Sequence, residues 1–157
     1  MAVTTTTPED STVVGVPIRL MADPAVDGSA LGVVEDVLVH GNRVLGAEGV
    51  GIELRRTSRC EVTGNTLRAI RRRVPFPGNT LDDDPEPWEV ANGAAIWISP
   101  GSEGNLVARN SILDLDGESV VIEGDGNRIE VSSEDESVRD LGRANTLWRR
   151  GVEESDR

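Results

Sequence analysis

The segment from Arg71 to Asn92 carries side chains that could bind a charged sugar. It begins with three consecutive arginines, and guanidinium groups form paired hydrogen bonds with carboxylates. Tryptophan adds a large amphipathic ring that can stack on a ligand. The predicted ligand is therefore a carboxylated sugar. Its expected contacts are Arg71, Arg72, Arg73, Trp88 and an outward-facing Trp97.

The same segment also contains an acidic run that could bind a cation. Ca²⁺ takes several oxygen ligands, so the predicted metal ligands are Asp82, Asp83 and Asp84. Consecutive carboxylates converge poorly, and a solvated acidic turn is the alternative. In that structural interpretation the arginines pair with this run, while Phe76 and Trp88 pin the loop to the fold. No cofactor other than Ca²⁺ is expected.

Nucleophilic catalysis has little support, because the chain contains one histidine and one cysteine. A Ser-His-Asp triad, a Cys-His pair and a Cys/His zinc site all have few candidate residues. His40 is expected at the surface and Cys60 as a small core residue. Asp114, Asp116 and Glu118 cluster around one bend, and paired carboxylates there could perform glycoside hydrolysis. In a chain with 28 acidic residues, however, such proximity is expected by chance.

The formal net charge of −12 argues against nucleic acid and anionic membranes as partners, since both require a basic surface. The first residues lack the basic start and apolar run of a signal peptide. No apolar stretch approaches the length of a membrane span. The expected location is therefore the cytoplasm, or an exported assembly of which this chain is one part.

A repeat indicates how these residues are positioned. Three segments, 36–44, 59–67 and 104–112, each place an apolar residue three positions before an asparagine and another two positions after it. The spacing between equivalent asparagines is 23 residues from Asn42 to Asn65. Stacked coils with this period would align the asparagines at one bend, where their amides satisfy backbone groups. The expected inward ladder consists of Asn42, Asn65 and Asn110.

A second family of short strands alternates with this repeat, at 51–54, 95–98 and 119–122. Their period-two pattern places one apolar set inward. The expected outward row is Glu53, Trp97 and Val121, with the segment before Trp97 covering it or leaving it open to a partner.

The sequence therefore predicts an all-β fold, a short right-handed parallel β-helix of about four coils with a long inserted loop. An antiparallel sandwich would give no reason for the asparagine register to repeat. Residues 1–157 form one expected domain. Its expected parts are an N-terminal cap or arm at 1–15, the inserted loop at 71–92, and a C-terminal cap and tail at 132–157, in which Leu141 and Leu147 cover the core.

The Gly-Asn units followed by alternating strands resemble the parallel β-helix repeats of the pectate-lyase-like superfamily, which includes NosD-type and mannuronan-epimerase-type proteins. The resemblance covers roughly 34–131 and carries over no catalytic residue. The leading hypothesis is a non-catalytic module that binds a carbohydrate or protein, or has a structural role in a larger assembly. The alternative is a lyase, hydrolase or epimerase acting on uronate-rich polysaccharide. The exposed final strands would also allow homo-oligomers.

Overall fold

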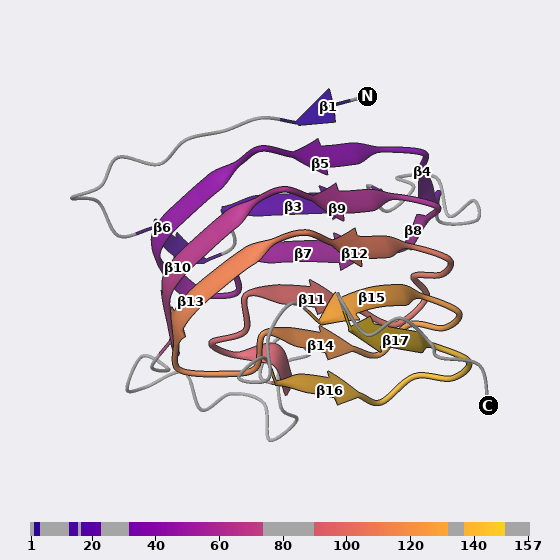
Figure 1. Ribbon diagram of the computed structural model, residues 1–157. Coiled ribbons are helices and arrows are strands. Elements are labelled where there is room, and N and C mark those ends of the chain that lie inside the picture. Colours follow the sequence, from indigo (N-terminus) through magenta and orange to yellow (C-terminus); the bar gives the residue numbers. More distant parts are fainter. Residues whose placement is uncertain are drawn as a thin grey trace, which may run out of the picture.

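The computed structural model describes residues 2–3, 13–15, 17–22, 32–73, 90–131 and 137–149 (Figure 1). These residues form parallel β-strands and no α-helix. Most strands belong to three sheets, A, B and C, and β4 (Val34–Glu35) pairs with β8 (Thr57–Ser58) in a small fourth sheet. The predicted all-β class with parallel pairing is confirmed.

Each sheet is built from strands that are far apart in the sequence. Sheet A has the order β1 (Ala2–Val3), β5 (Leu38–His40), β9 (Glu61–Thr63), β12 (Leu106–Ala108), β15 (Arg128–Val131) and β17 (Thr146–Arg149). Sheet B has the order β13 (Ser111–Leu115), β10 (Thr66–Arg71), β6 (Arg43–Gly49) and β2 (Val13–Gly15). Sheet C has the order β16 (Val138–Asp140), β14 (Val120–Ile122), β11 (Ile96–Ile98), β7 (Ile52–Arg55) and β3 (Ile18–Met21).

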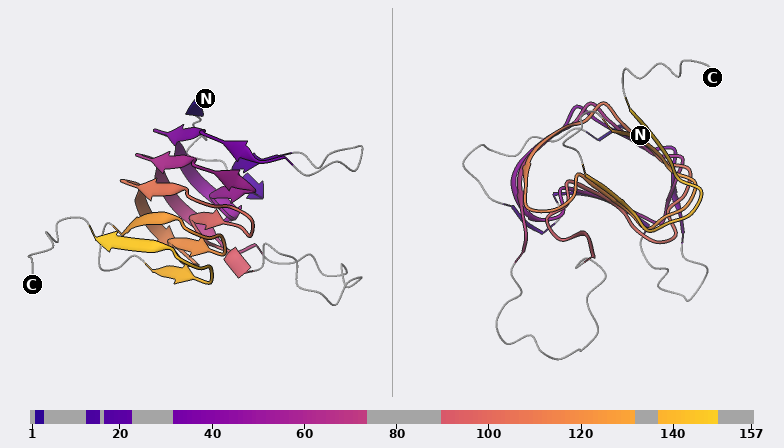
Figure 2. Two further views of the ribbon diagram at one scale, coloured as in Figure 1. Left: turned by 90° about the vertical axis from the view of Figure 1, so that its right-hand side faces the viewer. Right: turned by 60° about the horizontal axis from the view of Figure 1, so that its bottom comes forward.

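From β5 to β15 the chain visits sheets A, B and C in the same order and adds one strand to each sheet per circuit. We call one such circuit a coil. Viewed along the stack, the coils superimpose on one another (Figure 2). This stacking of parallel strands is compatible with a β-helix.

The core lies inside the coils and consists of aligned aliphatic side chains. Ile96 of β11 pairs in register with Ile52 of β7 and Val120 of β14, as the alternation predicts, and all three are buried. Because β-branched side chains pack well on a pleated surface, each row continues from coil to coil without a gap.

The predicted asparagine ladder is present at the bend between sheets A and B. Asn65 Oδ1 accepts hydrogen bonds from the backbone N–H of Asn42 at 2.9 Å and from the Asn42 amide Nδ2 at 3.0 Å. Asn110 Oδ1 accepts the equivalent pair from Asn65, both at 3.0 Å. The ladder satisfies buried backbone groups that the bend leaves without a strand partner.

A second ladder, which the sequence reasoning did not assign, lies where the chain enters sheet A. Asn127 Oδ1 accepts from the backbone N–H of Asn105 at 2.9 Å, and Asn145 Oδ1 accepts from that of Asn127 at 2.8 Å. Asn145 introduces β17, which pairs with β15, while β16 pairs with β14. The described part of the expected C-terminal cap, 137–149, therefore adds strands to the stack. Leu141 and Leu147 remain 52% and 46% exposed.

Cys60 occupies a position in this second ladder. Its backbone N–H donates to Asn105 Oδ1 at 3.0 Å, and its Sγ lies 3.5 Å from the carbonyl oxygens of Val34 and Ser58. In the first ladder the Asn65 amide donates to carbonyls at the same sequence offsets, 26 and 2 residues earlier. The thiol is buried as predicted, and burial raises its pKa.

We expect Cys60→Asn to raise the free energy of unfolding by about 1 kcal/mol, because an amide donates stronger hydrogen bonds than a thiol. Chemical denaturation of the two proteins measures the difference. Cys60→Ala is the control, since it removes the donor and is expected to destabilise the fold. A Cys60→Asn protein no more stable than Cys60→Ala would contradict the ladder assignment.

The entrance to sheet A requires a left-handed residue in every coil. Asp36, Arg59, Gly104, Gly126 and Ala144 hold equivalent places there, with φ between 54° and 63°. Only two of the five are glycine, so the bend imposes a conformation that disfavours most L-residues. At this bend Arg59 donates to both Asp36 carboxylate oxygens at 3.0 Å, which lowers the pKa of Asp36.

Candidate functional site

Hydrogen bonds between Arg73 and Asn92 join the two ends of the inserted segment, and we call this junction the neck. Asn92 Oδ1 accepts from the backbone N–H of Arg73 at 2.7 Å, and Asn92 Nδ2 donates to the Arg73 carbonyl at 2.9 Å. The stacking resumes at once, because Gly93 N–H donates to the Gly49 carbonyl at 2.6 Å. The predicted ligand contact Trp88 and the predicted metal ligands Asp82, Asp83 and Asp84 lie outside the described residues.

The arginines at the neck face carboxylates of the neighbouring strand. Arg71 Nη2 lies 2.8 Å from Asp114 Oδ2, and Arg71 Nη1 lies 3.3 Å from Asp116 Oδ1. Hydrogen bonding with Asp114 raises the pKa of Arg71. The backbone N–H of Arg72 also donates to Asp116 Oδ2 at 3.1 Å. The clustering of Asp114 and Asp116 is thus present, and it serves to hold the neck against β13.

Trp97 stacks in register with Glu53 and Val121 on the outer side of sheet C, as predicted. Its side chain is only 1% exposed, so the expectation of an open stacking ring there is corrected. The ring packs with apolar residues that include Ala91, at the end of the inserted segment 71–92, and Ala94 just after it, in agreement with the covering alternative. Its Nε1 donates to Glu123 Oε2 at 2.7 Å.

Glu53 is outward, as predicted, and fully buried. Its Oε2 accepts from Arg19 Nε at 2.5 Å, and its Oε1 lies 3.3 Å from Arg55 Nε. A buried carboxylate is costly to desolvate without cationic partners, and the two arginines supply them.

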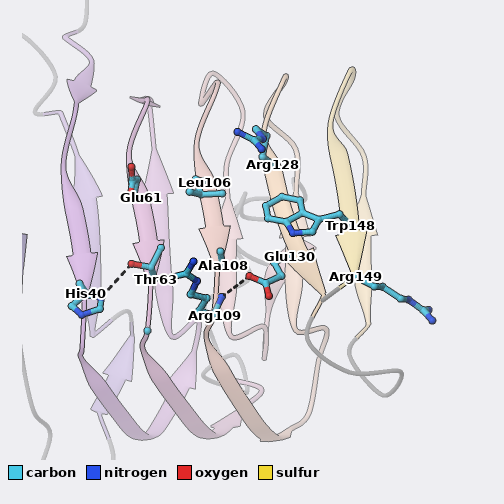
Figure 3. A pocket seen from close by; sticks show the side chains of 11 residues that line it. His40, Glu61, Thr63, Leu106, Ala108, Arg109, Arg128, Glu130, Trp148 and Arg149 are labelled. Carbon is cyan, nitrogen blue, oxygen red and sulfur yellow. Dashed lines mark hydrogen bonds between the residues drawn. The ribbon is translucent and has the colours of Figure 1, made fainter. Parts of the chain in front are cut away.

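A groove of about 590 Å³ lies on the outer face of sheet A (Figure 3). It crosses strands β5, β9, β12, β15 and β17, so it runs along the stack. We call it the sheet A groove. Its lining residues are His40, Glu61, Thr63, Gly64, Leu106, Ala108, Arg109, Arg128, Glu130, Trp148 and Arg149.

Strand register arranges these side chains in rows. Thr63 aligns with His40 on one side and with Ala108 on the other, and Glu130 aligns with Trp148 further along. Neighbouring members of a row are about 4.8 Å apart because that is the spacing of adjacent strands. The groove therefore presents a regularly repeated surface.

The end of the groove at β15 and β17 is aromatic and charged. The Arg128 guanidinium carbon lies 5.5 Å from the centre of the half-buried Trp148 ring, within range of a cation–π contact. Glu130 Oε2 accepts from the backbone N–H of Arg109 at 3.2 Å. Arg109 has φ of 57°, whereas glycine, Gly64, stands at the equivalent bend one coil earlier.

The other end of the groove is polar. His40 is exposed, as predicted, and its Nδ1 lies 3.2 Å from Thr63 Oγ1 (Figure 3). In total, the groove contains three arginines and two glutamates, a local excess of positive charge on a chain with net charge −12.

Sequence reasoning did not assemble this groove. Its members come from five separate strands, and no short motif connects them. The groove residues could have been found from the alternation along each strand. Residues next in sequence to the inward Val39, Val62, Val107 and Ile129 must face outward.

Within the described ranges, no group of three or more His, Cys, Asp or Glu residues is placed to hold a metal ion. The same residues contain no helix long and apolar enough to cross a membrane. No family model, curated protein or solved structure matches the chain. The resemblance to the pectate-lyase-like superfamily therefore stays a prediction, and function has to be argued from the geometry.

Proposed function

We propose that this chain is a right-handed parallel β-helix of the pectate-lyase-like kind that binds a polysaccharide without cleaving it. The proposed binding site is the sheet A groove. The observation that carries the proposal is the half-buried Trp148 at one end of a groove that crosses five strands. An aromatic ring combined with regularly spaced hydrogen-bonding side chains suits an extended polymer of repeating polar units.

The charge of the groove favours an acidic polysaccharide over a neutral one. Arg109, Arg128 and Arg149 outnumber Glu61 and Glu130. Guanidinium groups recognise carboxylates by paired hydrogen bonds. Binding of an acidic chain is therefore expected to weaken as salt screens these contacts.

The placement of the carboxylates supports binding rather than hydrolysis. Glu61 and Glu130 lie two strand spacings and two residues apart, which separates their Cα atoms by about 12 Å. The hydrogen bond from the Arg109 backbone N–H holds the Glu130 carboxylate at the bend that follows β12. Glycosidases place their paired carboxyl groups about 5 to 9.5 Å apart, a range that these two glutamates would reach only with their side chains leaning toward each other. Asp114 and Asp116, the other adjacent pair, are bound to Arg71.

The test is Trp148→Ala, compared with the wild type on a panel of neutral and uronate-rich polysaccharides with and without Ca²⁺. We expect affinity for the bound polysaccharide to fall at least about tenfold, because the stacking ring is lost. Leu113→Ala is the matched control, since Leu113 is 56% exposed on sheet B, outside the groove. Affinity is measured by calorimetry, and products are assayed for new chain ends and altered uronate composition.

If Trp148→Ala kept its affinity for the polysaccharide, the binding site would not be the sheet A groove. New chain ends or epimerised uronates would contradict the binding hypothesis and support the alternative, a lyase, hydrolase or epimerase. In that case the neck arginines Arg71 to Arg73 would be the first residues to substitute.

A further inference from the structure

The last coil leaves apolar side chains uncovered at one end of the stack. Leu147 of β17 aligns with Ile129 of β15 and so lies on the inward face, but it is 46% exposed whereas Ile129 is fully buried. Leu141, which follows β16, is 52% exposed. A hollow of about 260 Å³ opens here, lined by Val131, Val138, Leu147, Trp148 and Arg149.

The opposite end of the stack is different. The inward residues of β3, Ile18 and Leu20, are only 4% and 9% exposed. Among the described inward residues of the end strands, apolar exposure is found at the end formed by β16 and β17 and not at β3. Head-to-tail stacking of copies would require two complementary ends, whereas tail-to-tail pairing requires the same end twice.

The stretches that adjoin the last strands in sequence carry little apolar area. The two stretches that adjoin the last strands in sequence, 132–136 and 150–157, contain one apolar side chain, Val152. Their other side chains are serine, aspartate, glutamate and arginine. Such stretches cannot bury an aliphatic core end, because they lack the apolar area to do so.

We infer that this end binds a second copy of the chain, forming a two-fold tail-to-tail dimer in which the two cores become continuous. β17 is the last strand of sheet A, and two such edges related by a two-fold axis pair antiparallel. Inward residues must lie opposite inward residues for the cores to join. Of the inward positions, we place Leu147 on the axis, opposite Leu147 of the partner subunit, because this brings the exposed apolar side chains together.

This register also pairs opposite charges. With Leu147 on the axis, Asn145 lies opposite the partner's Arg149. Asp140 Oδ1 accepts from Asn145 Nδ2 at 2.7 Å, so the Asp140 carboxylate sits beside the position that the partner's Arg149 reaches. The two-fold axis forms this contact twice. Both Asp140 and Arg149 are exposed in the single chain.

The test is sedimentation equilibrium of the full chain from about 1 µM to about 1 mM. We expect a dimer that does not grow further. Leu147→Arg places two positive charges against each other on the axis and is expected to raise the dimer dissociation constant at least about 100-fold. Leu113→Arg introduces the same charge at an exposed leucine on sheet B and is expected to leave dimerisation unchanged.

Leu147→Ser, which adds no charge, and thermal unfolding of each variant separate loss of the interface from loss of the fold. Arg149→Glu is expected to weaken the dimer about tenfold by repelling the partner's Asp140. A monomer at all concentrations would overturn the inference. So would open-ended growth, or a dimer that survives Leu147→Arg. Because Arg149 also lines the sheet A groove, the Leu147 variants, which leave the groove side chains in place, separate this inference from polysaccharide binding.

Discussion

Replacing Asn65 by leucine is expected to lower the free energy of unfolding by about 3 to 5 kcal/mol. Leucine has the same branched shape and number of side-chain heavy atoms as asparagine, but its methyl groups are bulkier and form no hydrogen bonds, so the change removes polar contacts and leaves no cavity. Asn65 is 1% exposed and stands between two other asparagines of the first ladder. Its loss leaves the backbone N–H and the amide of Asn42 without their acceptor, and the carbonyl of Val39 without its donor.

Buried polar groups that lose their partners cannot turn to water, and this makes the expected loss large. Asn145→Leu is the control. Asn145 has the equivalent role at the end of the second ladder but is only partly buried, so water can replace its contacts. We expect that change to cost about 1 kcal/mol. Urea denaturation measures both variants, and equal losses would show that burial does not set the contribution of the ladder.

Gly51→Ala is expected to destabilise the fold by about 2 to 4 kcal/mol. A Cβ added at this position would lie 2.6 Å from the Ala95 carbonyl oxygen of the next coil and 2.8 Å from Leu67 Cδ2. The Ala95 carbonyl cannot easily move away, because it accepts the backbone hydrogen bond of Ile52 at 2.8 Å. The added methyl group would therefore push two coils apart.

Gly41→Ala separates this effect from ordinary backbone strain. Gly41 has φ of 68°, and a Cβ there would meet nothing within 4 Å. Its expected cost is only the penalty for a left-handed L-residue, about 1 to 2 kcal/mol. Thermal unfolding of the two variants ranks them. If Gly41→Ala were the more damaging change, the close approach of the coils at Gly51 would not be what makes that glycine necessary.

The stacking could be predicted from sequence because the period of the repeat equals the length of a coil. The 23 residues from Asn42 to Asn65 bring equivalent side chains into register, and the alternation at 51–54, 95–98 and 119–122 gave the correct inward and outward rows. Both signals depend only on spacing, which a single sequence contains.

The burial of the outward row could not be predicted in the same way. Trp97 is covered by Ala91 and Ala94, which lie at and just after the non-repetitive end of the insertion. The last coil was not predicted because its repeat is shorter. Asn127 and Asn145 are 18 residues apart, whereas Asn105 and Asn127 are 22 residues apart. The sheet A groove depends on outward residues of five strands, and outward positions carry no periodic constraint on residue type.

The closed neck at Arg73 and Asn92 has a consequence for how such a protein could diversify. The hydrogen bonds that join these two residues are made by the Arg73 backbone and the Asn92 amide, so they do not depend on the peptide between them. A peptide of another length at 74–89 would cost little, since doubling a loop costs about 0.6 kcal/mol. Recombination or design could therefore exchange the peptide between Arg73 and Asn92 for another one. The strands on either side of this junction would not have to change.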